Sequence, residues 1–188
     1  MELINEIEKE TELLMGKYEA YILFMLSKKT QKIEGDLAEV GVYRGGSAKL
    51  LCKTKGEKSL YLFDTFEGLP EVVSVDIESS KGEYNANFEE VKNYLKKYKN
   101  VYIYRGLFPG TSKPIKNKVF SFVHLDVDIY RSTLDGLKFF YPRMNKGGII
   151  LSHDISAPGV KKAFDEFFKD KPEYVIELSR AQGFIVKL

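Results

Sequence analysis

Four side chains able to transfer a proton or bind a cation stand at the ends of two apolar runs late in the chain. Asp126 and Asp128 close the first run, and His153 and Asp154 close the second. If the two runs are neighbouring parallel strands, these groups meet at one edge of a sheet. Carboxylate-rich sites suit Mg²⁺, Ca²⁺ or Mn²⁺, and a spare carboxylate can accept a proton from a hydroxyl that the cation has acidified. We therefore expect a divalent-cation site at Asp126, His153 and Asp154, with Asp126 or Asp128 as the base.

A purely structural interpretation of these residues also stays open. Asp126 or Asp128 could cap a helix that begins near Ser132, and Asp154 could cap a turn. His124 lies in the middle of an apolar run. We expect it to be a hydrogen-bonded histidine of the core.

A glycine-rich turn at residues 36–47 predicts a ligand site at the end of an early strand. Glycine allows tight turning and lets the backbone approach a ligand closely. Glu39, inside the strand, is suited to receive a ligand's ammonium group, whereas a nucleotide-phosphate loop favours lysine there. The pattern favours S-adenosylmethionine (SAM) over NAD or ATP, with Glu39, Gly41, Gly45 and Ser47 as cofactor-binding residues. Ser47 is also expected to cap the next helix, and the alternative is that the turn is only a tight strand–helix junction.

Two later segments could complete this cofactor site. Asp64, followed by Thr65, ends the second apolar strand, and an acid in this position binds a ribose diol in dinucleotide folds. The alternative is that Asp64 only caps the turn after it. Arg105 and Gly106 begin a glycine- and aromatic-containing loop that could line an adenine slot.

Hydrophobic periodicity predicts the elements that position these residues. One long or two short amphipathic helices are expected over residues 3–28. Strands are then predicted at 37–42, 60–63, 101–104, 120–125 and 149–152, and helices at 48–52, 88–98, 132–141 and 160–168. Strands that are apolar on both faces and alternate with helices indicate a Rossmann-like, doubly wound α/β sheet that is mostly parallel.

The last part of the chain breaks this alternation. The strands predicted at 174–178 and 183–188 are separated by only four residues, too few for a parallel crossover, so they must pair as an antiparallel hairpin. A parallel sheet that ends in such a hairpin is the outline of the SAM-dependent methyltransferase fold. Residues 71–87 form the one long irregular stretch and are a candidate for a mobile lid.

Length and composition place the chain among ordinary globular proteins. Its 188 residues predict a single domain, with a helical segment at 1–34 and a core at 35–188. A net charge of +2, from 29 basic and 27 acidic side chains, argues against a nucleic-acid or membrane partner. The lone Cys52 excludes an intramolecular disulfide and is expected in the core. The sequence shows no signal peptide and no run long enough to span a bilayer, so we expect a cytoplasmic protein that could form a homo-oligomer.

Several motifs resemble the macrocin/mycinamicin O-methyltransferase family. The most specific are the Asp-x-Asp-x-Tyr-x-Ser-Thr run that begins at Asp126, the Tyr-Pro-Arg that follows its helix, and a Gly-Gly pair. The glycine turn and the Phe-Asp-Thr-Phe-Glu-Gly-Leu-Pro segment fit as well, so the resemblance covers residues 35–188. It implies SAM-dependent methylation of a hydroxyl on a small molecule or sugar, assisted by Mg²⁺. It also implies metal ligands at Asp126 and Asp154 and cofactor contacts at Glu39, Gly41, Ser47 and Asp64.

The chain departs from this family in two places. The family usually carries two adjacent acids after the fifth strand, where this chain has His153 and Asp154, and an imidazole is a poorer partner for Mg²⁺ than a carboxylate. The segment before the first strand is also shorter than is typical. Two alternatives therefore stay open: a SAM-binding module with lost or altered catalysis, and a nicotinamide-dependent oxidoreductase on the same type of sheet.

Overall fold

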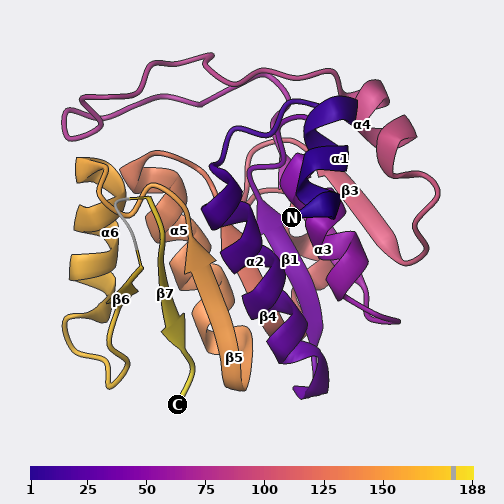
Figure 1. Ribbon diagram of the computed structural model, residues 1–188. Helices are drawn as coiled ribbons and strands as arrows, with labels where there is room; N and C mark the ends of the chain where they lie inside the picture. Colours follow the sequence, from indigo (N-terminus) through magenta and orange to yellow (C-terminus); the bar gives the residue numbers. More distant parts are fainter. Residues whose placement is uncertain (179–180) are drawn as a thin grey trace.

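The computed structural model describes residues 1–178 and 181–188, and a seven-stranded sheet forms its centre (Figure 1). Residues 179 and 180, in the predicted hairpin connection, lie outside the described residues. The spatial order of the strands is β3-β2-β1-β4-β5-β7-β6. The strands are β1 (Asp36–Val40), β2 (Leu60–Asp64), β3 (Val101–Arg105), β4 (Phe120–Leu125), β5 (Met144–Ser152), β6 (Ile176–Glu177) and β7 (Gly183–Val186).

Helices cover both faces of the sheet. They are α1 (Glu2–Glu10), α2 (Lys17–Lys29), α3 (Gly46–Thr54), α4 (Phe88–Leu95), α5 (Tyr130–Phe140) and α6 (Pro158–Phe168), with short 3₁₀ turns η1 (Thr30–Lys32), η2 (Lys113–Ile115) and η3 (Tyr141–Arg143). Side chains of α1 to α4 pack with one face of the strands, and those of α5 and α6 pack with the other. Figure 1 shows α2 in front of the sheet, next to β1. The predicted doubly wound α/β fold is confirmed.

The strand pairing places a ligand-binding position between β1 and β4. The strands β1 to β5 pair in parallel, whereas β7 is antiparallel to both β5 and β6. The predicted antiparallel hairpin is thus confirmed, although its strands are shorter than expected. The chain order reverses where β1 meets β4, and open α/β sheets bind ligands outside the carboxyl ends of the strands at such a point.

Several element boundaries differ from the sequence expectation. β5 begins at Met144, five residues before the predicted start at residue 149. Helix α3 begins at Gly46 after Gly45, whose φ of 81° is left-handed, and no side chain caps it. The prediction that Ser47 caps this helix is therefore wrong, because Ser47 lies inside the first turn. Among the described residues, no helix is long and apolar enough to cross a membrane.

A buried glutamate ties the C-terminus to the body of the fold. Glu173 is 5% exposed, and its carboxylate accepts from Lys187 Nζ at 2.6 Å, from the Tyr141 hydroxyl at 2.7 Å and from the Leu188 amide at 3.3 Å. Burial opposes the charged form, but these hydrogen bonds prevail and lower the pKa of Glu173 to about 2. The ionised carboxylate is therefore bound more strongly in the folded protein than in the unfolded chain.

We expect Glu173→Gln to lower the free energy of unfolding by ~1–3 kcal/mol near neutral pH, since Lys187 loses its charged partner. The Glu173 contribution is complete above the unfolded pKa of 4.5 and is lost as the pH falls towards about 2, so the two proteins should converge in acid. Urea unfolding across this range measures the effect. The control is Glu177→Gln, an exposed acid paired with Lys161, which should change stability little. Equal effects of the two variants would contradict this assignment.

Candidate functional site

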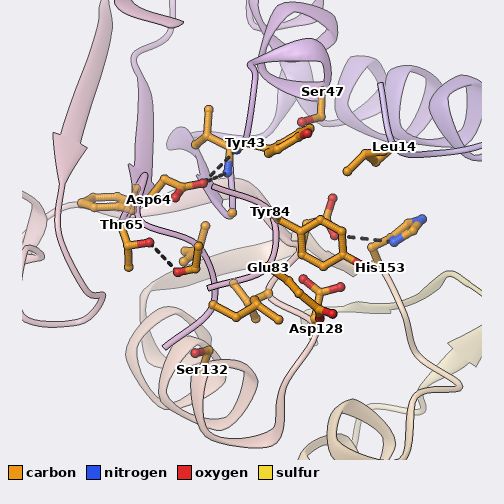
Figure 2. A pocket seen from close by; sticks show the side chains of 18 of the residues that line it. Leu14, Tyr43, Ser47, Asp64, Thr65, Glu83, Tyr84, Asp128, Ser132 and His153 are labelled. Carbon is orange, nitrogen blue, oxygen red and sulfur yellow. Dashed lines mark hydrogen bonds and ion pairs between the residues drawn. The ribbon is translucent and has the colours of Figure 1, made fainter. Parts of the chain in front are cut away.

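A cavity opens at the carboxyl ends of β1, β2, β4 and β5, where the strand order reverses. Figure 2 shows Asp64 and Thr65 at one end of this cavity and Asp128 and His153 at the other. Its wall includes nine of the predicted site residues, namely Gly41, Ser47, Asp64, Thr65, Gly106, Asp126, Asp128, His153 and Asp154. The sheet thus brings together residues that are far apart in the sequence, as the parallel arrangement predicts.

The glycine turn and β4 meet by direct backbone contact. The Asp126 amide donates to the Val40 carbonyl at 2.9 Å, and this bond extends the β1–β4 ladder to the edge of the cavity. Gly41 has a φ of 88°, and a Cβ there would lie 1.7 Å from the Asp126 carbonyl oxygen. No residue with a side chain fits this contact, so Gly41 sets the distance between the turn and the acids on β4.

Asp64 holds the same turn from the other side. Its Oδ2 accepts from the amides of Val42 and Tyr43 at 2.7 and 2.8 Å, and its Oδ1 accepts from the Phe66 amide at 2.7 Å. Asp64 does cap the turn after it, as the alternative interpretation held, but this is not its only position in the structure, because Asp64 also lines the cavity. Asp64 therefore shapes the glycine turn and forms part of the cavity wall. Both functions depend on its position at the end of β2.

Three groups suited to a cation converge at the other end of the cavity. His153 Nδ1 lies 2.8 Å from Asp154 Oδ2 and 3.5 Å from Asp126 Oδ1. One ligand atom of each of these residues lies within 4.8 Å of the others. On the far side of the ring, His153 Nε2 lies 3.4 Å from Glu19 Oε2, which also accepts from the Gly16 amide before α2. Carboxylates therefore flank the imidazole on both sides.

These carboxylates shift the protonation equilibria of the cluster. Burial alone would lower the pKa of His153, but the negative charges of Asp126 and Asp154 and the contact with Glu19 raise it to about 10. Burial, together with the charges of Asp126 and Asp154, raises the pKa of Asp128 to about 8. His153 is therefore an imidazolium near neutral pH, and its positive charge lies among these acids.

The donor set fits a divalent cation. Two carboxylates and an imidazole can all turn a ligand atom towards one point, and the carboxyl group of Asp128 lies in the same cavity wall. Repulsion among these acids, which raises the pKa of Asp128, would be relieved by a bound cation. Because imidazole suits softer transition-metal ions better than Mg²⁺, the mixed set is less selective for Mg²⁺ than an all-oxygen site.

Backbone strain is concentrated around the cavity. Six non-glycine residues in the described ranges have positive φ, and four of them line the cavity: Tyr43, Tyr84, Asp128 and Asp154. A left-handed residue with a side chain costs free energy and persists where surrounding contacts impose it, which is common at functional sites. Asp128 and Asp154 adopt this conformation within three residues of the ends of β4 and β5.

Three predicted cofactor residues do not line the cavity. Glu39 is completely buried, and its Oε1 lies 2.8 Å from His124 Nδ1 of the neighbouring strand. Gly45 faces α4, since a Cβ there would meet the Val91 and Tyr94 side chains. Arg105 points to the surface, where its Nη2 binds Glu67 Oε1 at 3.0 Å. The expectation that His124 is a hydrogen-bonded core histidine is confirmed by the same pair.

Other cavity residues were not predicted from the sequence. Leu14, half exposed, comes from the connection between α1 and α2, and Tyr84 comes from the long segment after β2 (Figure 2). Glu19 contacts His153 across 134 residues of sequence. Helical periodicity marks Leu14 only as an apolar position, and no local pattern signals which distant residue Glu19 reaches.

Relatives of known activity share a large part of this sequence. An 8-demethyl-8-(2,3-dimethoxy-alpha-L-rhamnosyl)-tetracenomycin-C 4'-O-methyltransferase from Streptomyces olivaceus is 29% identical over 152 residues, which cover 72% of this chain and 58% of the relative. A mycinamicin III 3''-O-methyltransferase from Micromonospora griseorubida is 25% identical over 170 residues, covering 79% and 66%. The match thus spans less than two thirds of the relatives' own length.

Solved structures and a family model agree with these matches. The O-methyltransferase NovP has a TM-score of 0.81 at 23% identity, over 93% of this chain and 81% of that one. A calicheamicin methyltransferase has a TM-score of 0.78 at 17% identity, over 98% and 91%. Both show the shared fold. The model of the macrocin-O-methyltransferase (TylF) family matches residues 24–178, most of the chain and all the strands that form the cavity. The chain therefore belongs to the macrocin O-methyltransferase family.

Proposed function

We propose that this protein transfers a methyl group from SAM to a hydroxyl of a small molecule or sugar. The observation that carries the proposal is the cavity where β1 meets β4. In it the glycine turn and Asp64, an acid in the position that binds ribose in dinucleotide folds, lie opposite a cluster of carboxylates. A nicotinamide-dependent oxidoreductase is disfavoured because the chain belongs to an O-methyltransferase family.

The cavity walls suit the parts of SAM. Asp64 can accept a hydrogen bond from a ribose hydroxyl at Oδ1, which keeps a lone pair beyond its bond to the Phe66 amide, whereas Oδ2 already accepts from two amides. Phe63, Leu107 and Phe108 supply an apolar surface for the adenine next to Gly106. The backbone at Gly41 and the Ser47 hydroxyl face the space left for the amino-acid part. We assign Asp64, Thr65, Gly41, Ser47 and Gly106 to cofactor binding.

The chemistry requires alignment and removal of one proton. SAM, when bound, would supply an activated methyl group on its sulfonium, and a cation held by Asp126, His153 and Asp154 would lower the pKa of the acceptor hydroxyl. Asp126 accepts the hydroxyl proton, because it directly follows β4 beside the glycine turn and lines the cavity. Asp128, with a pKa near 8, is the fallback base. Alignment of donor and acceptor by the rigid strand ends can contribute on the order of 7–11 kcal/mol.

We assign Asp126, His153 and Asp154 to a divalent cation, which would displace the proton from Nδ1 of His153 when it binds. Glu19 accepts at Nε2 of His153, which leaves Nδ1 turned towards the two carboxylates. Metal-bound histidines commonly have a carboxylate on their other nitrogen, where it fixes the ring orientation. The acid missing relative to the family pattern is thus replaced by an imidazole that Glu19 orients.

Removing the Asp64 carboxylate should weaken the cofactor complex. We expect Asp64→Ala to reduce the binding free energy of S-adenosylhomocysteine (SAH) by ~1–3 kcal/mol, because the ligand and the glycine turn both lose a partner. Calorimetric titration measures the affinity. Asp36→Ala is the control, since Asp36 also accepts from a backbone amide but lies at the opposite edge of the sheet. Unchanged affinity in a folded Asp64→Ala protein would contradict the assignment.

Asp126→Asn should abolish turnover while SAH affinity stays nearly unchanged. The amide keeps the shape of the carboxylate but cannot accept the proton, and loss of a general base typically costs ~10²–10⁴-fold in rate. The acceptors to test first are the rhamnosyl-tetracenomycin and the mycinamicin III that the relatives' names indicate. Methylation at the wild-type rate would remove Asp126 from the mechanism.

The same assays test the alternative function. If the wild-type protein binds SAH but methylates no acceptor, the chain is a SAM-binding module.

The metal assignment predicts chelator-sensitive transfer and direct cation binding. Because one ligand is an imidazole, Mn²⁺ should bind more tightly than Mg²⁺ in calorimetry or in the electron paramagnetic resonance of Mn²⁺. Asp154→Asn and His153→Ala should each weaken binding by about tenfold or more. Asp165→Asn, an exposed acid on α6, is the control. Transfer that is insensitive to chelators, or no Mn²⁺ binding, would exclude the site.

A further inference from the structure

The segment between β2 and α4 lies over the cavity and is fastened at its base. In Figure 1 it crosses the top of the view from the α4 side to a tip above α6. Near the base, the Leu69 amide donates to the Glu83 carbonyl at 2.8 Å and the Gly82 amide donates to the Leu69 carbonyl at 2.9 Å. This pairing places Glu83 and Tyr84 in the cavity wall.

The tip of the segment is fastened by one buried acid. Asp76 is 6% exposed, although it lies in a stretch with no helix or strand. Its Oδ1 accepts from the Tyr130 amide at 2.8 Å, and its Oδ2 accepts from the Val73 amide at 2.9 Å. One carboxylate therefore fixes the local turn and joins it to the start of α5, 54 residues later in the sequence.

The start of α5 has no cap from its own residues. Its N-cap position is Ile129, whose side chain cannot accept a hydrogen bond, so Tyr130 would present an unpaired amide without Asp76. A carboxylate there also interacts favourably with the helix dipole. Neither Asp126 nor Asp128 performs this capping, which leaves both free to face the cavity.

The start of α6 is shaped to admit this carboxylate. A Cβ on Gly159 would lie 1.9 Å from Asp76 Oδ1 and 2.9 Å from the Tyr130 nitrogen. Asp76, Tyr130 and Gly159 thus come from three separate segments and fit together only without a side chain at position 159.

We infer that Asp76 is a positioning residue. Its contact with Tyr130, which we call the latch, holds residues 71–87 over the cavity and orders the segment from Asp126 to Ile129. The inference rests on the proposed function. While Asp76 is bound to Tyr130, Glu83 and Tyr84 stay in the wall, and Asp128 keeps its left-handed backbone two residues before α5. Retention of the cofactor and placement of the acids are therefore coupled through one contact.

The first experiment uses trypsin, because Lys81 is exposed within the latched segment. Asp76→Ala should speed cleavage after Lys81 by about 5- to 10-fold without any ligand, since the loss of the buried contact raises the open population. Glu78→Ala, an exposed acid in the same segment, should cleave like the wild type. Equal cleavage of all three proteins would overturn the latch, and this result does not depend on whether the chain binds SAM.

The second experiment measures SAH binding. Asp76→Ala should weaken it by about 5- to 10-fold, and SAH should protect Lys81 in the wild type much more than in the variant. A purely structural role would lower the melting temperature without this ligand-dependent difference. If the wild type binds no SAH, the proposed function fails while the cleavage result still tests the latch. Wild-type SAH affinity and protection in Asp76→Ala would overturn the coupling.

Gly159→Ala tests the same contact from α6. Its Cβ should displace the Asp76 carboxylate, so this variant should also open Lys81 to trypsin. Adding it to Asp76→Ala should increase cleavage by less than the product of the two single effects. Independent effects would overturn the shared contact.

If the variants do not fold, hydrogen exchange of the wild type decides. The Tyr130 and Val73 amides should be protected to the same extent, and SAH should slow the exchange of both. Unequal behaviour of the two amides would contradict the latch.

Discussion

The site depends on the contact between the backbone of Gly41 and the carbonyl of Asp126. This contact joins the carboxyl ends of β1 and β4 at the point where the sheet reverses its strand order, and it leaves no room for a Cβ. The glycine turn is fixed to β4 on one side and, through the carboxylate of Asp64, to β2 on the other. The glycine turn and the acids on the other side of the cavity are therefore parts of one rigid unit.

That rigidity allows like charges to be held together. Asp126, Asp128 and Asp154 face the same space, and a freely moving chain would separate them. Here the strand ends and two left-handed backbone conformations impose the arrangement, while the His153 imidazolium offsets part of the repulsion. The result is a cavity end that favours positive charge, in accord with both a divalent cation and a sulfonium.

Much of this arrangement could be predicted because it follows from periodicity and parallel pairing. Apolar runs that alternate with helices specify the sheet, and the carboxyl ends of adjacent parallel strands bring Asp126 and Asp154 together. The short spacing before β7 required an antiparallel hairpin. What the sequence could not indicate are contacts between distant segments, such as Glu19 with His153 or Asp76 with Tyr130. Such pairs depend on how whole helices and loops pack, and no local pattern encodes them.

Glu39 shows the same limit for a residue that the sequence did single out. An acid in a buried strand suggested direct contact with a ligand, yet Glu39 lies behind the cavity wall, paired with His124. Burial raises the pKa of Glu39 to about 8 and lowers that of His124 to about 4, so both groups are neutral near physiological pH. A neutral carboxyl can donate its proton to the imidazole, and the pair adds no charge behind the wall. The electrostatic field in the cavity is then set by the acids at the strand ends. An acid in this buried strand did indicate that Glu39 has a polar partner, but that partner is His124 on the neighbouring strand and not a ligand.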